Sequence, residues 1–165
     1  MNKNLKNLIY AALFAALIFT ATRFVSIPAG PGYIHIGDAF IYICASVLPA
    51  PFAMAASAIG GALSDLTFGY VAYILPTAII KAACACSFTN KKQNMLCLRN
   101  FIAVFICYFI TVGGYAIAEK LMYGNEFAFW SSVIPNSIQA GASAVIYIAA
   151  AFVFDRIGLK KRFNG

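Results

Sequence analysis

Long apolar stretches alternate with short polar or Gly/Pro-containing breaks along the whole chain. A helix needs about 20 apolar residues to cross a hydrocarbon core about 30 Å thick. The pattern predicts six transmembrane helices, at residues 8–26, 38–49, 51–69, 71–89, 100–122 and 131–155. The second is the weakest, because Gly37 to Leu48 would make a helix only about 18 Å long before Pro49 and Pro51 interrupt it. We therefore expect an all-α protein with one integral membrane domain over residues 1–165.

The composition excludes a water-soluble fold. Hydrophobic residues fill 62% of the 165 positions and charged residues 10%, whereas soluble domains contain roughly 45–50% apolar and about 25% charged residues. The pattern also argues against a β-barrel, whose strands alternate apolar and polar residues. The stretches in this chain are continuous and rich in alanine, which favours a bundle of membrane helices.

The net charge of +7 does not indicate a nucleic-acid partner, because most of the basic residues border the apolar stretches. They form three patches: Lys3 and Lys6; Lys91, Lys92 and Arg99; and Arg156, Lys160, Lys161 and Arg162. Basic residues beside membrane helices mark the cytoplasmic side, where the lipid is anionic. We predict that both termini and the segment between the fourth and fifth helices lie on the cytoplasmic side, next to the lipid bilayer in which the helices are embedded.

Reactive side chains are few and scattered. The chain has five cysteines without a Cys-x-x-Cys pair and a single histidine, His35, so we expect no metal site. It also lacks a phosphate-binding loop of the Gly-x-x-x-x-Gly-Lys-[Ser/Thr] type and a nucleophile, base and acid set. We therefore expect no catalytic residues, no cofactor and no ATP site, and hence no enzyme.

Polar residues enter the last three helices in stripes with helical spacing. The stripes are Tyr73, Thr77 and Lys81 on the fourth helix, Tyr108, Thr111, Tyr115 and Glu119 on the fifth, and Ser132, Asn136, Gln139 and Ser143 on the sixth. Residues three and four apart share a helix face, and strongly polar groups in a membrane usually face a cavity. We predict a polar, aromatic-lined pocket between these helices, open to the outside. The alternative is that the stripes only hydrogen-bond helix to helix.

The first and third helices carry small residues at four-residue spacing. On the first helix these are Ala11, Ala12, Ala15 and Ala16. Such a face permits close approach of another helix, either within this chain or in a partner protein. Two carboxylates also need partners in the membrane: Arg23 is a candidate for Asp38, and Lys81 for Asp65.

A Gly/Pro-rich loop from Ile27 to Asp38 joins the first two helices. A segment of this kind can fold over a pocket as a lid, with Tyr33 or His35 reaching inward. The alternative is a tight connection without a role in binding.

Four motifs resemble the substrate-binding S components of energy-coupling factor (ECF) vitamin transporters, particularly the riboflavin group. They are GYIHIGDAF at 32–40, LPAP at 48–51, IGGALSD at 59–65 and LPTAIIK at 75–81. The resemblance implies a six-helix bundle that captures a vitamin from outside, with the loop motif on Tyr33, His35, Gly37 and Asp38 and the helix-four lysine on Lys81. It also implies docking through Ala11, Ala12, Ala15 and Ala16 onto a transmembrane coupling subunit driven by two cytoplasmic ATPases.

Together these features predict a multi-pass subunit of a bacterial-type plasma membrane that binds a B-type vitamin or precursor. The resemblance implies a ligand that is riboflavin-like, or pyridoxine- or pyrimidine-like. The candidate substrate-binding residues are Tyr33, His35, Asp38, Lys81, Tyr115, Glu119, Asn136 and Gln139. Two alternatives remain: a self-sufficient transporter that uses Asp65, Lys81 or Glu119 as a proton relay, and a structural membrane subunit without a ligand.

Overall fold

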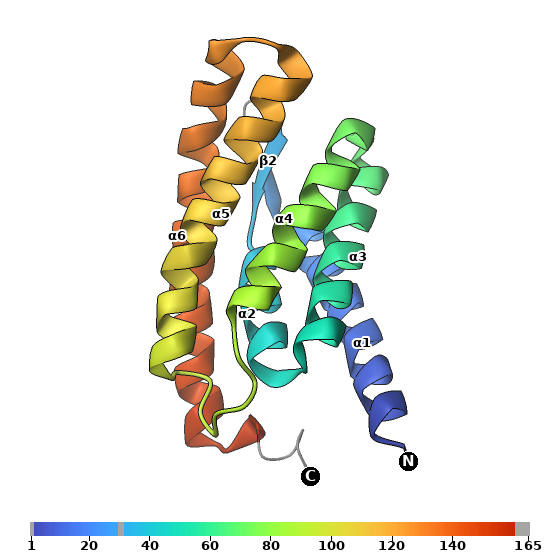
Figure 1. Cartoon of the computed structure of the whole chain (residues 1–165), viewed down its shortest axis with the longest axis vertical. Helices are drawn as coiled ribbons and strands as arrows, with labels where there is room; N and C mark the ends of the chain where they lie inside the picture. The colour runs from blue at the N-terminus through green and yellow to red at the C-terminus, as the bar shows by residue number, and fades with distance from the viewer. Residues whose placement is uncertain (1, 30–31, 161–165) are drawn as a thin grey trace.

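The computed structural model describes residues 2–29 and 32–160, which are mainly helical. In chain order the elements are α1 (Lys3–Phe24), β1 (Ser26–Ala29), β2 (Gly32–His35), α2 (Gly37–Val47), α3 (Ala50–Phe68), the 3₁₀ helix η1 (Val71–Tyr73), α4 (Ile74–Ser87), α5 (Leu98–Tyr123) and α6 (Glu126–Arg156) (Figure 1). The four middle helices lie within two residues of the predicted ranges, counting η1 with α4. The first and last helices begin five residues earlier than predicted.

Local capping explains the two early starts. The side chain of Asn2 accepts a hydrogen bond from the Asn4 N–H at 3.1 Å and so begins α1 ahead of its apolar stretch. Gly124, in the left-handed region with φ of 69°, ends α5. Asn125 then caps α6 at once by accepting from the Ala128 N–H at 2.7 Å, so the connection between these helices is shorter than the hydropathy pattern indicated.

The helices pack in sequence around a central short helix. α1 packs on α3, α3 on α4, α4 on α5 and α5 on α6, while α2 and the strands lie in the middle (Figure 1). α2 is about 16 Å long, and Phe40 is its only residue that is not buried. A helix too short to cross lipid is tolerated here because protein surrounds it.

The segment between α1 and α2, expected to be a Gly/Pro-rich loop, contains two short strands. β1 and β2 form an antiparallel pair in which Ser26 lies opposite His35 and Ala29 opposite Gly32. Residues 30 and 31 lie outside the described part. An extended segment inside a helical bundle must satisfy its own backbone groups, and pairing the two halves of the segment does this where a simple loop would not.

The end of the bundle opposite the strands is closed by segment 88–97, which connects α4 and α5. The Asn100 amide donates to the carbonyl oxygens of Thr89 and Met95, both at 3.0 Å, and to the Ser46 hydroxyl at 3.2 Å. The Asp155 carboxylate accepts from the Met95 N–H at 2.7 Å. These bonds tie the segment to α2, α5 and α6 in a region that is fully buried at Asn100 and Met95.

The start of α1, segment 88–97 and the end of α6 all lie at this same end of the bundle (Figure 1). The described residues of the three basic patches therefore lie at the same end of the molecule. Lys161 and Arg162 of the last patch lie outside the described residues. The arrangement agrees with the prediction that the patches share one side of the membrane.

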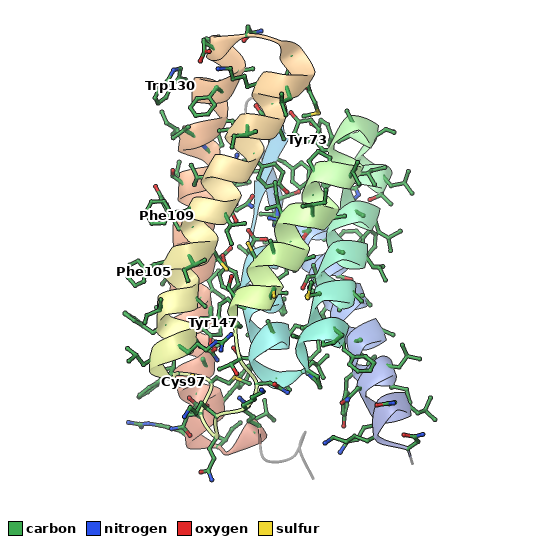
Figure 2. All side chains as sticks on the ribbon, in the orientation of Figure 1. Tyr73, Cys97, Phe105, Phe109, Trp130 and Tyr147 are labelled. Atoms are coloured by element: carbon green, nitrogen blue, oxygen red, sulfur yellow. The ribbon has the colours of Figure 1, made fainter. Side chains whose placement is uncertain are left out.

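Apolar side chains cover the outside of the bundle. Figure 2 shows Phe105, Phe109 and Trp130 projecting outward from α5 and α6, and all three are exposed. Within the described residues, α1, α5 and α6 are each long and apolar enough to cross a membrane, whereas α2 and Val71–Ser87 are shorter apolar helices. A surface of this kind is suited to lipid as the surrounding solvent, and the fold is a helical membrane bundle.

Candidate functional site

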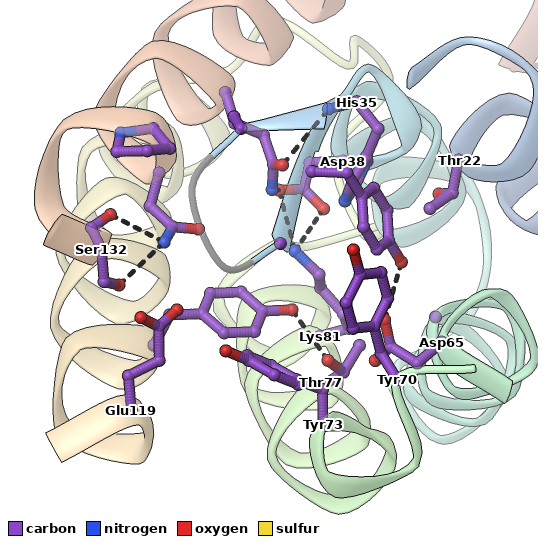
Figure 3. A pocket seen from close by; sticks show the side chains of 18 of the residues that line it. Thr22, His35, Asp38, Asp65, Tyr70, Tyr73, Thr77, Lys81, Glu119 and Ser132 are labelled. Carbon is purple, nitrogen blue, oxygen red and sulfur yellow. Dashed lines mark hydrogen bonds and ion pairs between the residues drawn. The ribbon is translucent and has the colours of Figure 1, made fainter. Parts of the chain in front are cut away.

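One cavity lies beside the strands, away from the end that segment 88–97 closes, and every element contributes to its wall (Figure 3). Its volume is about 50 Å³, well below the roughly 300–1,000 Å³ of pockets that hold drug-sized ligands. The prediction of a pocket between the last three helices was therefore too narrow: α1, α2, α3 and the strands also line it. The hydropathy pattern could not show this, because it does not reveal how the first half of the chain folds against the second.

All of the predicted substrate-binding residues line this cavity. They are Tyr33, His35, Asp38, Lys81, Tyr115, Glu119, Asn136 and Gln139. They come from β2, α2, α4, α5 and α6, so residues far apart in the sequence meet at one place. Tyr108 of the fifth-helix stripe does not belong to the group, because it is partly exposed and bonds to the Ser137 hydroxyl at 3.0 Å.

A buried ion pair crosses the floor of the cavity. The Lys81 ammonium lies 2.7 Å from Oδ1 of Asp38, and both side chains are 2% exposed. The Gln139 amide donates to Oδ2 of the same carboxylate at 3.0 Å. Because Asp38 lies in the first turn of α2, this arrangement joins α2 to α4 and α6 and neutralises a carboxylate that would otherwise be costly to bury.

This pairing corrects the expected partners of the two carboxylates. Asp38 pairs with Lys81 and not with Arg23, whose guanidinium lies 4.3 Å from the centre of the Phe68 ring. Asp65 instead accepts a hydrogen bond from the Tyr33 hydroxyl at 2.7 Å. The reason is the position of α2: the strands return the chain into the bundle, so that the start of α2 faces α4.

The strands are held against α6 by the same group of side chains. The His35 N–H donates to the Gln139 side-chain oxygen at 3.3 Å, and Nδ1 of His35 accepts from the Gly37 N–H at 3.0 Å. Burial lowers the pKa of His35 to about 4, although the nearby Asp38 charge acts in the opposite direction. The imidazole is therefore neutral at pH 7, as its acceptor role at Nδ1 requires.

Four tyrosines give the cavity an aromatic wall. They are Tyr33, Tyr70, Tyr73 and Tyr115. The rings of Tyr33 and Tyr70 stack with centroids 5.6 Å apart, and those of Tyr70 and Tyr73 meet edge to face at 5.9 Å. The Tyr115 hydroxyl shares a hydrogen bond of 3.0 Å with Thr77. Such rings offer flat apolar faces together with polar edges.

α6 lacks one backbone hydrogen bond where it borders the cavity. Pro135 lies inside the helix and lacks the N–H that would continue the backbone pattern. The Asn136 amide donates to the Ser132 carbonyl and hydroxyl oxygens at 2.9 and 3.1 Å. Among the described residues nothing donates to the Asn136 side-chain oxygen, which can therefore accept a hydrogen bond from a ligand.

Several lining residues were absent from the predicted set of binding residues. They are Thr22, Asp65, Tyr70, Tyr73, Thr77 and Ser132. Tyr73, Thr77 and Ser132 belonged to the predicted stripes, and Asp65 was recognised only as a charge in need of a partner. Thr22 and Tyr70 carried weaker signals, namely a lone hydroxyl in an apolar helix and an aromatic residue next to a helix end.

The small residues of α1 fall into two groups. Ala11 and Ala15 are buried against α3, where the close contact is shown by Gly60: a Cβ atom there would lie 2.9 Å from the Ala15 carbonyl oxygen. Ala12 and Ala16 are exposed. Both groups line an apolar groove between α1 and α3 with a volume of about 450 Å³. One group therefore packs the fold, and the other leaves a surface free.

A family model described as the ECF-type riboflavin transporter, S component, matches residues 2–153 of this chain. The matched range runs from the cap of α1 into α6 and includes every residue of the cavity and of the groove. No curated protein matches the chain.

Proposed function

Because this chain belongs to the family of ECF-type riboflavin transporter S components, we propose that it captures a small vitamin or precursor as the substrate-binding subunit of an ECF importer. The observation that carries the proposal is the buried cavity, in which tyrosine faces alternate with a few fixed polar groups. Cofactor and substrate sites have this composition, because apolar faces bind the ring and polar groups orient it. A binding role, not catalysis, is proposed.

The candidate substrate-binding residues divide into two roles in this proposal. Tyr33, Tyr115, Glu119 and Asn136 contact the ligand. His35, Asp38, Lys81 and Gln139 bond mainly to one another and hold the strands, α2, α4 and α6 in place around it. The ligand is a riboflavin-like or a pyridoxine- or pyrimidine-like heterocycle. A ring system as large as a flavin requires the strands to move outward, because the closed cavity is small.

The test is to identify the small molecule that copurifies with the detergent-extracted protein by mass spectrometry and to titrate it calorimetrically. Asn136→Ala should weaken binding about 5- to 150-fold, because ligand polar groups lose a partner in a dry site. Ser143→Ala is the matched control, since Ser143 is a buried polar residue of the same helix outside the cavity. Parent-like affinity of Asn136→Ala, Gln139→Ala and Lys81→Met together would place the site elsewhere.

The energy source in this proposal is a transmembrane coupling subunit with two cytoplasmic ATPases. The exposed residues of the α1–α3 groove, Ala12 and Ala16, are the proposed contact surface, because an apolar groove with small residues admits a partner helix closely. Ala16→Trp should abolish transport while ligand affinity remains. Ala149→Trp, at an exposed position of α6, is the matched control and should transport normally. Parallel loss of affinity in Ala16→Trp would contradict the docking role.

The proposed topology has six membrane segments, with both termini and segment 88–97 cytoplasmic in a bacterial-type plasma membrane. Its support is that the basic patches share one end of the bundle. In a background free of native cysteines, an impermeant thiol reagent added outside should label a cysteine introduced at Asn125 and not one at Lys92. Labelling at Lys92 would reverse the orientation.

A proton-coupled secondary transporter is the second candidate. It is favoured by two buried carboxylates of the cavity, Asp65 and Glu119, each with an oxygen that has no hydrogen-bond partner among the described residues. Uptake that survives ATP depletion but collapses with the proton gradient would support this candidate against the ATP-driven importer.

A further inference from the structure

The cavity is lined by more carboxyl groups than positively charged groups. Asp38, Asp65 and Glu119 contribute carboxylates, and Lys81 contributes the one ammonium group among the described lining residues. His35 is neutral at pH 7 because burial lowers its pKa to about 4. Lys81 pairs with Asp38 at 2.7 Å, so its charge is matched before the other two carboxylates are counted.

Asp65 and Glu119 are therefore buried without a cation. Each is 4% exposed, and the ion pairs formed by the described residues are Lys81–Asp38 and Lys120–Glu126. Tyr33 donates to one oxygen of Asp65, while Oδ2 of Asp65 and Oε2 of Glu119 have no hydrogen-bond partner in the described part of the chain. A buried carboxylate without a cation is costly, and these two border a cavity into which a cationic group could enter (Figure 3).

The aromatic wall of the cavity also favours a positively charged ligand. Tyr33, Tyr70, Tyr73 and Tyr115 present rings around the cavity, and ring faces attract cations through their quadrupole. Tyr115 already acts in this way toward Lys81, whose ammonium lies 5.1 Å from the centre of the Tyr115 ring. Carboxylates and tyrosine faces around one small space are the arrangement that recognises an organic cation.

We propose that the ligand of this cavity is a compact heterocycle carrying a positively charged nitrogen, held between Asp65, Glu119 and the tyrosine rings, and not an uncharged three-ring flavin. The proposal rests on the proposed function, since it names the chemical class of substrate for the same site. A compact ring requires less outward movement of the strands than a three-ring flavin does, because the closed cavity has a volume of only about 50 Å³. The positive charge of the ligand then provides the cation that Asp65 and Glu119 lack.

The test uses a matched pair of probes that share one ring. Pyridoxamine carries an ammonium group at pH 7 where pyridoxine carries a hydroxyl, and riboflavin serves as the uncharged large probe. Calorimetric titration of the full-length parent protein in detergent should give at least about tenfold tighter binding of pyridoxamine than of pyridoxine. Because this comparison uses the parent protein, it does not depend on the folding of any variant.

Two isosteric variants then test whether Asp65 and Glu119 cause the preference for the ammonium probe. Glu119→Gln should remove most of the tenfold preference for the ammonium probe, and Asp65→Asn should do the same. Glu126→Gln is the matched control: it removes the same charge from an exposed residue that pairs with Lys120 outside the cavity, and the preference should remain.

The outcomes separate this inference from the proposed function. Equal binding of the two ring-matched probes, tighter binding of riboflavin, or an unchanged preference in both Glu119→Gln and Asp65→Asn would overturn the cationic ligand and leave a vitamin-binding subunit. If no probe binds and no small molecule copurifies with the folded protein, the proposed function itself fails.

Discussion

Replacing Lys81 by methionine tests the most heavily buried interaction of the cavity. Methionine has nearly the shape of the lysine stem, so the change removes the charge and leaves the packing largely intact. The Lys81 side chain is almost completely buried and lies 2.7 Å from Asp38. After the substitution, the Asp38 carboxylate keeps the Gln139 hydrogen bond of 3.0 Å and its place in the first turn of α2.

The expected loss of stability is large. Removing one partner of a buried ion pair costs about 3–5 kcal/mol, because the other charge stays buried. The first turn of a helix stabilises a carboxylate by about 0.3–1 kcal/mol, so the lower end of the range, about 3 kcal/mol, is expected. For a protein of this size the loss corresponds to a fall in Tm of about 6–12 °C. The double variant Asp38→Asn/Lys81→Met should recover most of it, because no charge is then left unpaired.

A thiol-reactive fluorogenic dye can follow this unfolding in detergent. Cys44, Cys84 and Cys107 are buried and become reactive only when the bundle opens, whereas the exposed Cys86 and the partly exposed Cys97 should be replaced by serine to remove the background signal. The matched control is Lys120→Met, which breaks an exposed ion pair with Glu126 and should change stability by no more than about 1 kcal/mol.

Two results would contradict a large contribution of the Lys81–Asp38 ion pair. A Lys81→Met variant that melts within about 2 °C of the parent would mean that the ion pair contributes less than about 1 kcal/mol. A double variant no more stable than Lys81→Met would mean that the loss comes from packing or from a missing lysine contact, and not from an unpaired Asp38.

Three further predictions concern packing, pH and the closed end. Gly60→Ala should destabilise by about 1–3 kcal/mol, because its Cβ would lie 2.9 Å from a carbonyl oxygen of α1, whereas Gly113→Ala, with nothing within 4 Å, should be neutral or stabilising; equal melting temperatures would contradict this. Between pH 6.5 and about 4, His35 becomes protonated in the unfolded chain but stays mostly neutral in the folded chain, because its pKa there is lowered to about 4. The free energy of unfolding should therefore fall by about 3 kcal/mol more for the parent than for His35→Asn over this range, as measured by pH-dependent melting. Asn100→Ala should speed tryptic cleavage within segment 88–97, because the Asn100 side chain bonds to the backbone of that segment. Ligand affinity should not change, because the segment lies far from the cavity; unchanged cleavage would show that other contacts are enough to hold the segment in place.

The sequence was sufficient to predict the helices and most of the polar residues of the cavity. The length of an apolar stretch and the position of a Pro or Gly next to it act locally, so they predict helix ranges without knowledge of neighbours. A stripe such as Tyr115 and Glu119 is also local, because helical periodicity alone puts its members on one face. The ends of α1 and α6 differed because the caps Asn2 and Asn125 lie outside the apolar stretches.

The sequence could not choose the partner of Asp38. Lys81 lies 43 positions away and Gln139 101 positions away, and several charged residues were available at comparable separation. The choice follows from the strand pairing between Ser26 and His35, which turns the chain back and aims α2 at α4. Each strand has only four residues, which is too short for an alternating hydrophobic pattern to predict the strand pairing.

The amino-acid sequence is enough to establish the class of molecule: an apolar chain with basic patches must form membrane helices, and their polar faces must turn away from lipid. The tertiary structure alone decided which faces meet. It divided the alanines of α1 into a buried pair, Ala11 and Ala15, and an exposed pair, Ala12 and Ala16, and it left Asp65 and Glu119 without a cation in a common cavity. The physical reason is that helix formation depends on neighbours in the sequence, whereas charge pairing and groove formation depend on how the helices pack against one another.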